Sequence, residues 1–362
     1  MNRSTITLGD LTIGEGAPCL VIPEGCDNHM GSLERAKEMA HAAKEAGASI
    51  IKWQLHLPEE EMVKDEAIAA SRDMLAKWGS IWDFVSKFRL SVDDHYELKR
   101  YCEKIGIQYF CTPFSLKAAE ILNEMGVSGF KIGSGETEDL PMIEEVAKMG
   151  RPMIVSTGMT TPDEVDLTVN TIRKTKTPFA LAHCMSIYAA QSADTLNYGL
   201  IRALNARYGV PVGLSDHTPP DPIRAANGAM VNHDARIWAT VHQGANFIEK
   251  HFTLDRNQPD ADSCFSLNPK DLRELITTVR SAEEAMGKER RVYPQEARVA
   301  QWAKRSVVSA VDIPKGTTLT RAMITSKRPG TGIRSKDYQA IIGKTAVRLI
   351  PQNRLIQWHD LA

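Results

Sequence analysis

The chain has 362 residues, with 44 Lys and Arg against 45 Asp and Glu, so its formal net charge is −1. A near-neutral chain without a strongly basic tract argues against nucleic acid as the main partner. No apolar run approaches the roughly 20 residues that a membrane-spanning helix needs, and the N-terminus has no secretory signal. The six cysteines form no Cys-x-x-Cys pair, and most are expected to be reduced core thiols. We therefore expect a cytoplasmic protein with no membrane partner.

Short apolar runs recur along the chain at intervals that leave room for a helix between them. In chain order, these runs are residues 19–22, 49–53, 108–111, 129–132, 152–155, 179–182, 212–214 and 246–248. The runs do not alternate strictly between apolar and polar residues, which is typical of parallel strands buried on both faces. We interpret each of them as a β-strand.

Helical patterns fill the intervals between these strands. The first interval has five apolar residues on one helical face: Leu33, Ala36, Met39, Ala40 and Ala43. Ser32 is the expected N-cap of this helix, and Gly47 is expected just beyond its end.

Eight strand–helix units predict a (β/α)₈ TIM barrel of roughly 250 residues or a little more. A doubly wound open sheet is the rival fold, but it requires a reversal of strand order that the sequence does not display. The chain has no G-x-G-x-x-G or Walker A run that would favour a nucleotide-binding version of that fold.

The sequence changes character near Met286. Residues 287–291 are charged and lack periodicity, and the segment after about residue 305 is dense in Pro, Gly and short apolar pairs. These patterns predict a barrel over residues 1–286, a linker over 287–304, and a small turn-rich, β-containing domain over 305–362.

Catalytic residues of a (β/α)₈ barrel come from the C-terminal ends of its strands. Here these ends carry polar or charged residues: Glu24, Lys52, Gln54, Thr112, Lys131, Ser134, Glu136, Ser156, Ser186, Tyr188, Ser215, His217, Lys250 and His251. Lysines, serines and a threonine at one mouth can bind the oxygens of a dianion. Two histidines leave positions open on a divalent ion, and two carboxylates supply candidate acids or bases.

Each of these residues also has a purely structural explanation. Lys52 could lie along Trp53, Glu24 could cap the next helix, and a single histidine at a strand end is more often structural than a metal ligand. Functional groups at the ends of all eight strands together indicate an anion-binding barrel enzyme.

The same residues carry a resemblance to a known family. The matching stretches are Glu24 with 28–31, 51–54, 111–115, 130–136, 156–159, 183–188, 215–218 and 249–255. The chain resembles the sialic acid synthases, or nonulosonate synthases, over almost its whole length. Its tail resembles the antifreeze-like (SAF, β-clip) domain of that family, with residues 327–332 as the signature.

The resemblance implies a transferase of polysaccharide biosynthesis that forms a C–C bond. Phosphoenolpyruvate (PEP) condenses with N-acetylmannosamine or a related N-acetylated aldose to give a nonulosonic acid and phosphate. The implied PEP-binding residues are Lys52, Thr112, Lys131, Ser134, Ser156, Ser186 and Ser215. The implied sugar-binding residues are Gln54, Tyr188, Asp262 and Arg328, and Glu24 and Glu136 handle protons.

The resemblance also implies a metal ion and a partner subunit. His217 and His251 would bind a divalent ion, with Mn²⁺ preferred and Mg²⁺ or Co²⁺ possible. In a domain-swapped homodimer, the antifreeze-like domain would cap the barrel of the other subunit and bring Arg328 to the sugar.

The sequence departs from the family pattern at three places. After Tyr188 the family usually has Pro-x-Pro, whereas residues 189–191 are Ala-Ala-Gln, so a different sugar-side loop is expected. The interval between His217 and His251 is longer than in typical members, and its residues 219–222 and 232–236 predict a loop at the rim. After Asp262 many members have a histidine and a small residue, whereas this chain has the run 263–267 with Phe265. A phenylalanine there favours a less polar sugar such as a 2,4-diacetamido-2,4,6-trideoxyhexose, as in legionaminate or pseudaminate synthases.

Two other functions stay open at this stage. One is a barrel that binds a phosphorylated ligand without catalysis. The other is a non-sialate, PEP-dependent deoxy-sugar-acid synthase, which would need a second phosphate site.

Overall fold

The computed structural model describes residues 5–71, 78–188, 192–258, 262–287 and 290–362 of the chain. It divides into two compact units, Met1–Gly287 and Lys288–Ala362. Each unit has a hydrophobic core of its own. Among the described residues, no helix is both long enough and apolar enough to cross a membrane.

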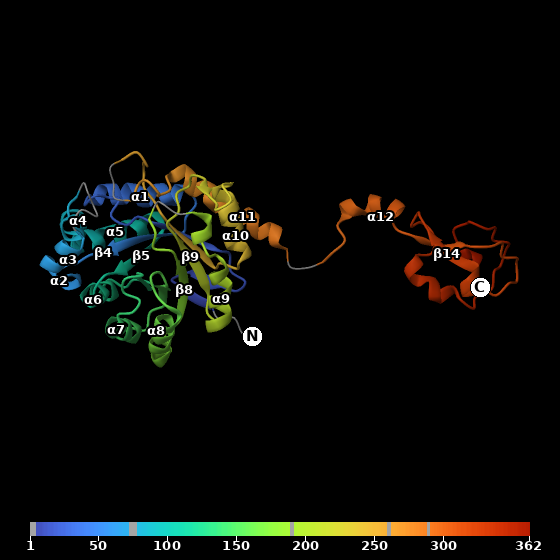
Figure 1. Ribbon diagram of the computed structural model, residues 1–362, viewed down its shortest axis with the longest axis horizontal. Coiled ribbons are helices and arrows are strands. Elements are labelled where there is room, and N and C mark those ends of the chain that lie inside the picture. Colours follow the sequence, from blue (N-terminus) through green and yellow to red (C-terminus); the bar gives the residue numbers. More distant parts are fainter. Residues whose placement is uncertain (1–4, 72–77, 189–191, 259–261, 288–289) are drawn as a thin grey trace. The chain divides into compact units, whose positions relative to one another are not determined.

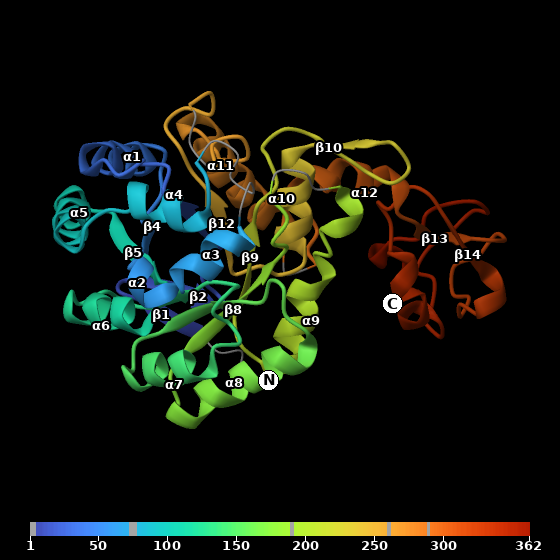
Figure 2. The ribbon, with the colours of Figure 1, turned by 60° about the vertical axis from the view of Figure 1, so that its left-hand side comes forward.

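The first unit is built around an eight-stranded parallel barrel (Figures 1 and 2). Its strands are β3 (Leu20–Glu24), β4 (Ile50–Leu55), β5 (Gln108–Pro113), β6 (Phe130–Ile132), β7 (Met153–Ser156), β8 (Phe179–Cys184), β9 (Val212–Asp216) and β12 (Phe247–His251). They pair in the order β5-β4-β3-β12-β9-β8-β7-β6, and β5 also contacts β6. This ring follows chain order without a reversal, which confirms the (β/α)₈ barrel and excludes the doubly wound sheet.

Helices surround the barrel (Figure 2). They are α1 (Leu33–Glu45), α2 (Pro58–Glu61), α3 (Lys64–Ala70), α4 (Ile81–Phe88), α5 (Val92–Ile105), α6 (Leu116–Glu124), α7 (Leu140–Lys148), α8 (Pro162–Thr175), α9 (Gly199–Tyr208), α10 (His233–His242) and α11 (Pro269–Met286). In α1, Ser32 is the N-cap and accepts a hydrogen bond from the Arg35 backbone N–H. Ala46 is the C-cap, so Gly47 is the next residue, with a φ of 102°. The predicted caps of this helix are therefore confirmed.

A two-stranded antiparallel hairpin precedes the barrel and was not predicted. It consists of β1 (Thr5–Leu8) and β2 (Leu11–Gly14). Its apolar side chains pack with the inward-facing residues of the strands in one cluster: Ile6, Leu8, Ile13, Ile22, Ile50, Phe110, Ile154, Ala180, Ala182 and Phe247. The inside of the barrel is thus a packed core, and polar side chains on the inner face occur beyond it, toward the C-terminal ends of the strands.

The long interval between the two predicted metal histidines contains a second hairpin, β10 (Ile223–Arg224) with β11 (Met230–Val231). The loop expected over residues 232–236 is wrong, because these residues begin α10. Asn232 caps this helix by accepting a hydrogen bond from the Ala235 backbone N–H.

The second unit is small and rich in turns. It pairs β13 (Ser306–Ser309) with β14 (Ile324–Lys327) and adds short 3₁₀ turns, and its core is lined by Val307, Ile313, Leu319, Ile324, Ile333, Ile341, Ala346, Ile350 and Ile356. The predicted small β-containing domain is therefore present. Within residues 287–304, which we expected as a linker, lies the short helix α12 (Ala297–Ala303).

Candidate active site

Strand register brings the predicted residues together at one end of the barrel. Glu24 lies opposite both Lys52 on β4 and His251 on β12. Ser215 on β9 lies opposite Glu249 on β12. Because side chains alternate along a strand, residues two apart in β12 point to the same face, and Glu249 and His251 both face inward.

Lys250 was expected at the rim, and this expectation is wrong. The alternation along β12 turns its side chain to the outer face, where it is fully buried. Its Nζ donates to Asp216 Oδ2 at 2.9 Å and to the Thr218 carbonyl oxygen at 2.6 Å. Lys250 therefore ties together the strand ends that carry the two histidines.

Two lysines and two carboxylates form a buried ion cluster at the rim. Lys52 pairs with Glu24, and its Nζ lies 3.8 Å from Glu249 Oε1. Lys131 Nζ lies 3.5 Å from the same oxygen, which also accepts a hydrogen bond from Ser215 at 2.9 Å. Burial opposes the ionisation of Glu249, but Lys131 and Lys52 hold its pKa well below the usual value. Both ammonium groups thus face one buried point, where an anionic ligand could replace the carboxylate.

Hydroxyl groups lie next to this cluster. Lys52 donates to Thr112 Oγ1 at 3.1 Å, and the hydroxyls of Ser134 and Ser156 are 2.8 Å apart. A Cβ placed on Gly158 would lie 2.4 Å from Ser186 Oγ and 2.5 Å from Ser134 Oγ. The absence of a side chain at Gly158 therefore leaves room for these two hydroxyls.

Replacing Gly158 by alanine is expected to weaken anion binding. The new methyl group must displace the hydroxyls of Ser134 and Ser186, so the KM for the anionic substrate should rise roughly tenfold, as for the loss of one charge-assisted hydrogen bond. Gly135→Ala is the matched control, because a Cβ there meets nothing within 4 Å. Steady-state kinetics would contradict this prediction if both variants kept the wild-type KM.

The second predicted acid, Glu136, is largely buried and close enough to Lys131 to feel its charge. Burial raises the pKa of its carboxyl to about 7, although Lys131 acts in the opposite direction. A carboxyl group with such a pKa can hold or release a proton near neutral pH.

A chain of hydrogen bonds fixes the orientation of Gln54. Its Nε2 donates to Glu24 Oε1 at 3.0 Å, and its Oε1 lies 3.1 Å from His56 Nε2. His56 Nδ1 lies 3.1 Å from Glu61 Oε2, and burial opposes its charged form, but Asp27 and Glu61 raise its pKa. The Gln54 carbonyl oxygen can only accept, so His56 Nε2 donates to it, and the Gln54 amide N–H group faces Glu24. Sequence reasoning missed His56, because it lies beyond the end of β4 and its partner Asp27, 3.6 Å from Nε2, comes from the segment after β3.

The two predicted metal histidines lie side by side. The ring centroids of His217 and His251 are 5.1 Å apart. His217 Nδ1 lies 3.1 Å from the Met185 carbonyl oxygen, a contact that favours a proton on Nδ1 and leaves Nε2 with a lone pair. His251 Nδ1 lies 3.1 Å from Asp262 Oδ2.

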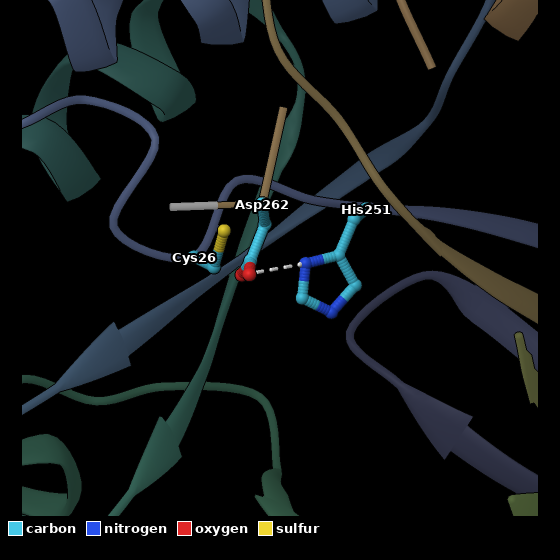
Figure 3. Close-up of side chains that lie close together, drawn as sticks. All are labelled: Cys26, His251 and Asp262. Carbon is cyan, nitrogen blue, oxygen red and sulfur yellow. Dashed lines mark ion pairs between the residues drawn. The ribbon is translucent and has the colours of Figure 1, made fainter. Parts of the chain in front are cut away.

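A cysteine thiol lies close to His251 and Asp262. Ligand atoms of Cys26, His251 and Asp262 all lie within 4.8 Å of one another (Figure 3). Thiolate, imidazole and carboxylate groups all bind divalent metal ions, so the residues present fit such an ion.

Aromatic rings line the side of the site that faces these histidines. Tyr188 is half exposed, and its ring centroid lies 4.5 Å from that of His217. Phe265 is buried, with its ring centroid 5.0 Å from that of His251 and 5.6 Å from that of Tyr188. This part of the site is therefore less polar than the lysine cluster.

Arg328 belongs to the second unit, so its predicted contact with the sugar stays a prediction. It is exposed, and its guanidinium lies 5.4 Å from the ring centroid of Trp302. The other predicted site residues all belong to the barrel unit.

The fold and this site define a class of protein: a barrel enzyme with a buried dication site for an anion beside candidate metal ligands. The model of the NeuB family matches residues 39–291, and the model of the SAF domain matches residues 304–362. The chain therefore belongs to the NeuB family of sialic and nonulosonic acid synthases.

Relatives and solved structures of this family match nearly the whole chain. An N,N'-diacetyllegionaminic acid synthase of Campylobacter jejuni is 32% identical, over 93% of this chain and 98% of the relative. A human N-acetylneuraminate-9-phosphate synthase is 32% identical, over 95% of this chain and 93% of the relative. The crystal structure of a sialic acid synthetase from Leptospira borgpetersenii has a TM-score of 0.71 and 29% identity, and the match covers 82% of this chain and 95% of that one. The chain is accordingly a PEP-dependent nonulosonic acid synthase.

Proposed function

We propose that this enzyme condenses PEP with N-acetylmannosamine or a related N-acetylated hexose to give a 3-deoxy-nonulosonic acid and inorganic phosphate. The observation that carries the proposal is the placement of Lys52 and Lys131 on one buried carboxylate, beside two adjacent histidines. A small dianion can take the place of that carboxylate, and an aldehyde can reach the histidines.

The lysines and hydroxyls would bind PEP. Lys52 and Lys131 neutralise its phosphate and carboxylate, and the hydroxyls fix the positions of the remaining oxygens; these hydroxyls are Thr112, Ser134, Ser156, Ser186 and Ser215. Buried ammonium groups interact strongly with an anion because little water screens them.

His217 and His251 would hold the divalent ion that the family uses, with Mn²⁺ as the expected metal. Bound there, such an ion would polarise the aldehyde oxygen of the sugar. Gln54, Tyr188 and Asp262 would hold the sugar hydroxyl and acetamido groups on the same side.

The reaction balances with the residues at the rim. C3 of PEP forms a bond to the aldehyde carbon, whose oxygen takes up a proton. Water adds to C2, and the bond between C2 and the phosphate oxygen breaks, so inorganic phosphate leaves. Of the two protons of this water, one goes to the phosphate and the other returns to Glu136. The Glu24 carboxylate, paired with Lys52, stabilises the positive charge that develops at C2. Glu136 supplies the proton to the aldehyde oxygen.

The proposed role of Glu136 predicts a pH dependence. Its raised pKa of about 7 means that the carboxyl still carries its proton at a pH where an ordinary glutamate is ionised. Because the protonated form donates, kcat should fall as pH rises through about 7. The residual rate of Glu136→Gln should lack this fall in a pH–rate profile. An unchanged profile in that variant would assign the ionisation to another group.

The second unit would complete the site from another subunit. We expect residues 305–362 to cap the barrel of the partner in a domain-swapped homodimer, after a linker at 287–304, and to bring Arg328 to the sugar. A cap excludes bulk water and protects the charged intermediate. The buried free cysteines are consistent with a protein that acts in a reducing compartment such as the cytoplasm.

A 2,4-diacetamido-2,4,6-trideoxyhexose, the precursor type for legionaminate or pseudaminate, is the second candidate sugar. The buried Phe265 ring against Tyr188 and His251 favours it, because a methyl group packs better there than a hydroxymethyl group. Phosphate release from PEP should be measured with free N-acetylmannosamine, its 6-phosphate and the trideoxy sugar. The proposal requires N-acetylmannosamine to give the highest kcat/KM, and a higher value for the trideoxy sugar would select the second candidate.

A further inference from the structure

The cluster of Cys26, His251 and Asp262 is assembled from three separate segments. Cys26 follows β3, His251 ends β12, and Asp262 lies in the loop after β12 (Figure 3). Their ligand atoms lie within 4.8 Å of one another. A single ion with bonds of about 2.0–2.3 Å spans ligand atoms somewhat closer than this, so small side-chain movements suffice.

The backbone at Cys26 adopts an unfavourable conformation. Its φ is 37°, in the left-handed region that favours glycine, and its side chain is buried. A non-glycine residue there costs of order 1 kcal/mol or more. The strain places the sulfur beside His251 and Asp262, where a glycine would have no ligand to offer.

The surroundings of this thiol attract a cation. Burial raises the pKa of the Cys26 thiol, and the carboxylates of Asp262, Glu24 and Asp27 raise it further, so without a bound cation the thiol keeps its proton. The Cys26 backbone N–H donates to Glu24 Oε1 at 3.1 Å. A divalent ion would offset this concentration of negative charge. His217, whose ring centroid lies 5.1 Å from that of His251, borders the cluster.

We propose that Cys26 is a thiolate ligand of the catalytic divalent ion, together with His251 and Asp262. The inference rests on the proposed function for the ion's place in the reaction, and it reassigns Asp262 from the sugar to the metal. A thiolate favours softer ions, so discrimination for Zn²⁺ and Co²⁺ over Mn²⁺ should exceed that of a site without sulfur.

Cobalt spectroscopy tests the ligand directly and without turnover. Metal-free full-length protein titrated with Co²⁺ should develop the intense near-ultraviolet absorption of a sulfur-to-cobalt charge transfer, at one equivalent. Cys26→Ser and Cys26→Gly should both lose this absorption. Glycine accepts the φ of 37° without strain, so the second variant guards against misfolding.

Two other cysteines serve as controls. Cys264 is exposed, and Cys184 Sγ lies 3.8 Å from His217 Nδ1. Cys264→Ser and Cys184→Ser should keep the charge-transfer band. The Zn²⁺ affinity of Cys26→Ser should fall by more than about tenfold. Even the loss of a residue that only hydrogen-bonds to a metal ligand lowers metal affinity by about that factor. The ratio of Zn²⁺ to Mn²⁺ affinity should fall with it.

The possible results separate this inference from the proposed function. Binding of Co²⁺ without the band, or a band that survives in Cys26→Gly, would overturn the thiolate ligand and leave the metal-assisted reaction intact. A band lost only in Cys184→Ser would assign the sulfur to Cys184 and also overturn it. Absence of any Co²⁺ binding would contradict both the inference and the metal's part in the proposed function.

Discussion

Replacing Lys131 by methionine is expected to raise the KM for PEP by about a hundredfold. Methionine keeps most of the apolar stem but removes the ammonium, and truncating one partner of a buried charge pair costs about 3 kcal/mol, or roughly that factor. Glu249 keeps Lys52 at 3.8 Å and Ser215 at 2.9 Å, so it stays partly compensated and the barrel should fold.

A surface lysine provides the matched control for this experiment. Lys117 lies on α6 with its side chain 53% exposed and pairs only weakly with Glu120, so Lys117→Met should keep the wild-type KM. Initial rates at varied PEP, with circular dichroism to verify folding, distinguish the two variants. An unchanged KM in Lys131→Met would place the anion site elsewhere.

Mixing two inactive variants is expected to restore activity if the second unit caps a partner. Arg328→Ala and His217→Ala should each lower kcat by about a hundredfold or more, as does loss of one group that stabilises transition-state charge. In a swapped mixed dimer, one site has both lesions and the other has neither. Random exchange then leaves about a quarter of all sites intact.

The complementation experiment needs proof that subunits exchange. Differently tagged variants should be unfolded and refolded together, and the mixed dimer isolated through both tags. It should reach about half the turnover of a wild-type dimer, because one of its two sites is intact. Mixed dimers without recovered activity would show that Arg328 acts within its own chain or not at all.

The barrel could be predicted because its signals are local. Each strand is a short apolar run, and the first helix is marked by its apolar face, Ser32 and Gly47. The hairpin of β1 and β2 also had a signal, the alternation of Ile6, Leu8, Leu11 and Ile13 around a Gly-Asp turn, which sequence reasoning overlooked. The loop predicted over residues 232–236 was wrong because asparagine favours both turns and helix N-caps. Here Asn232 is the N-cap of α10.

The sequence predicts only those site residues that lie at the ends of the apolar runs. Alternation along β12 would have paired Glu249 with His251 and turned Lys250 outward, but the end of an apolar run does not show which face is inside. His56 and Cys26 matter through partners from distant segments, such as Asp27 for His56 and Asp262 for Cys26. No sequence spacing encodes those contacts, because the fold creates them.

The central claim is that the rim joins PEP to an N-acetylated aldose with cleavage of the C2–O bond. PEP labelled with ¹⁸O in its bridging position tests it most directly, with phosphate and the sugar acid both analysed by mass spectrometry. We predict that phosphate appears only with the aldose, one for each nonulosonic acid formed, and that it carries the label. Phosphate released without the aldose, or label retained in the organic product, would contradict the account.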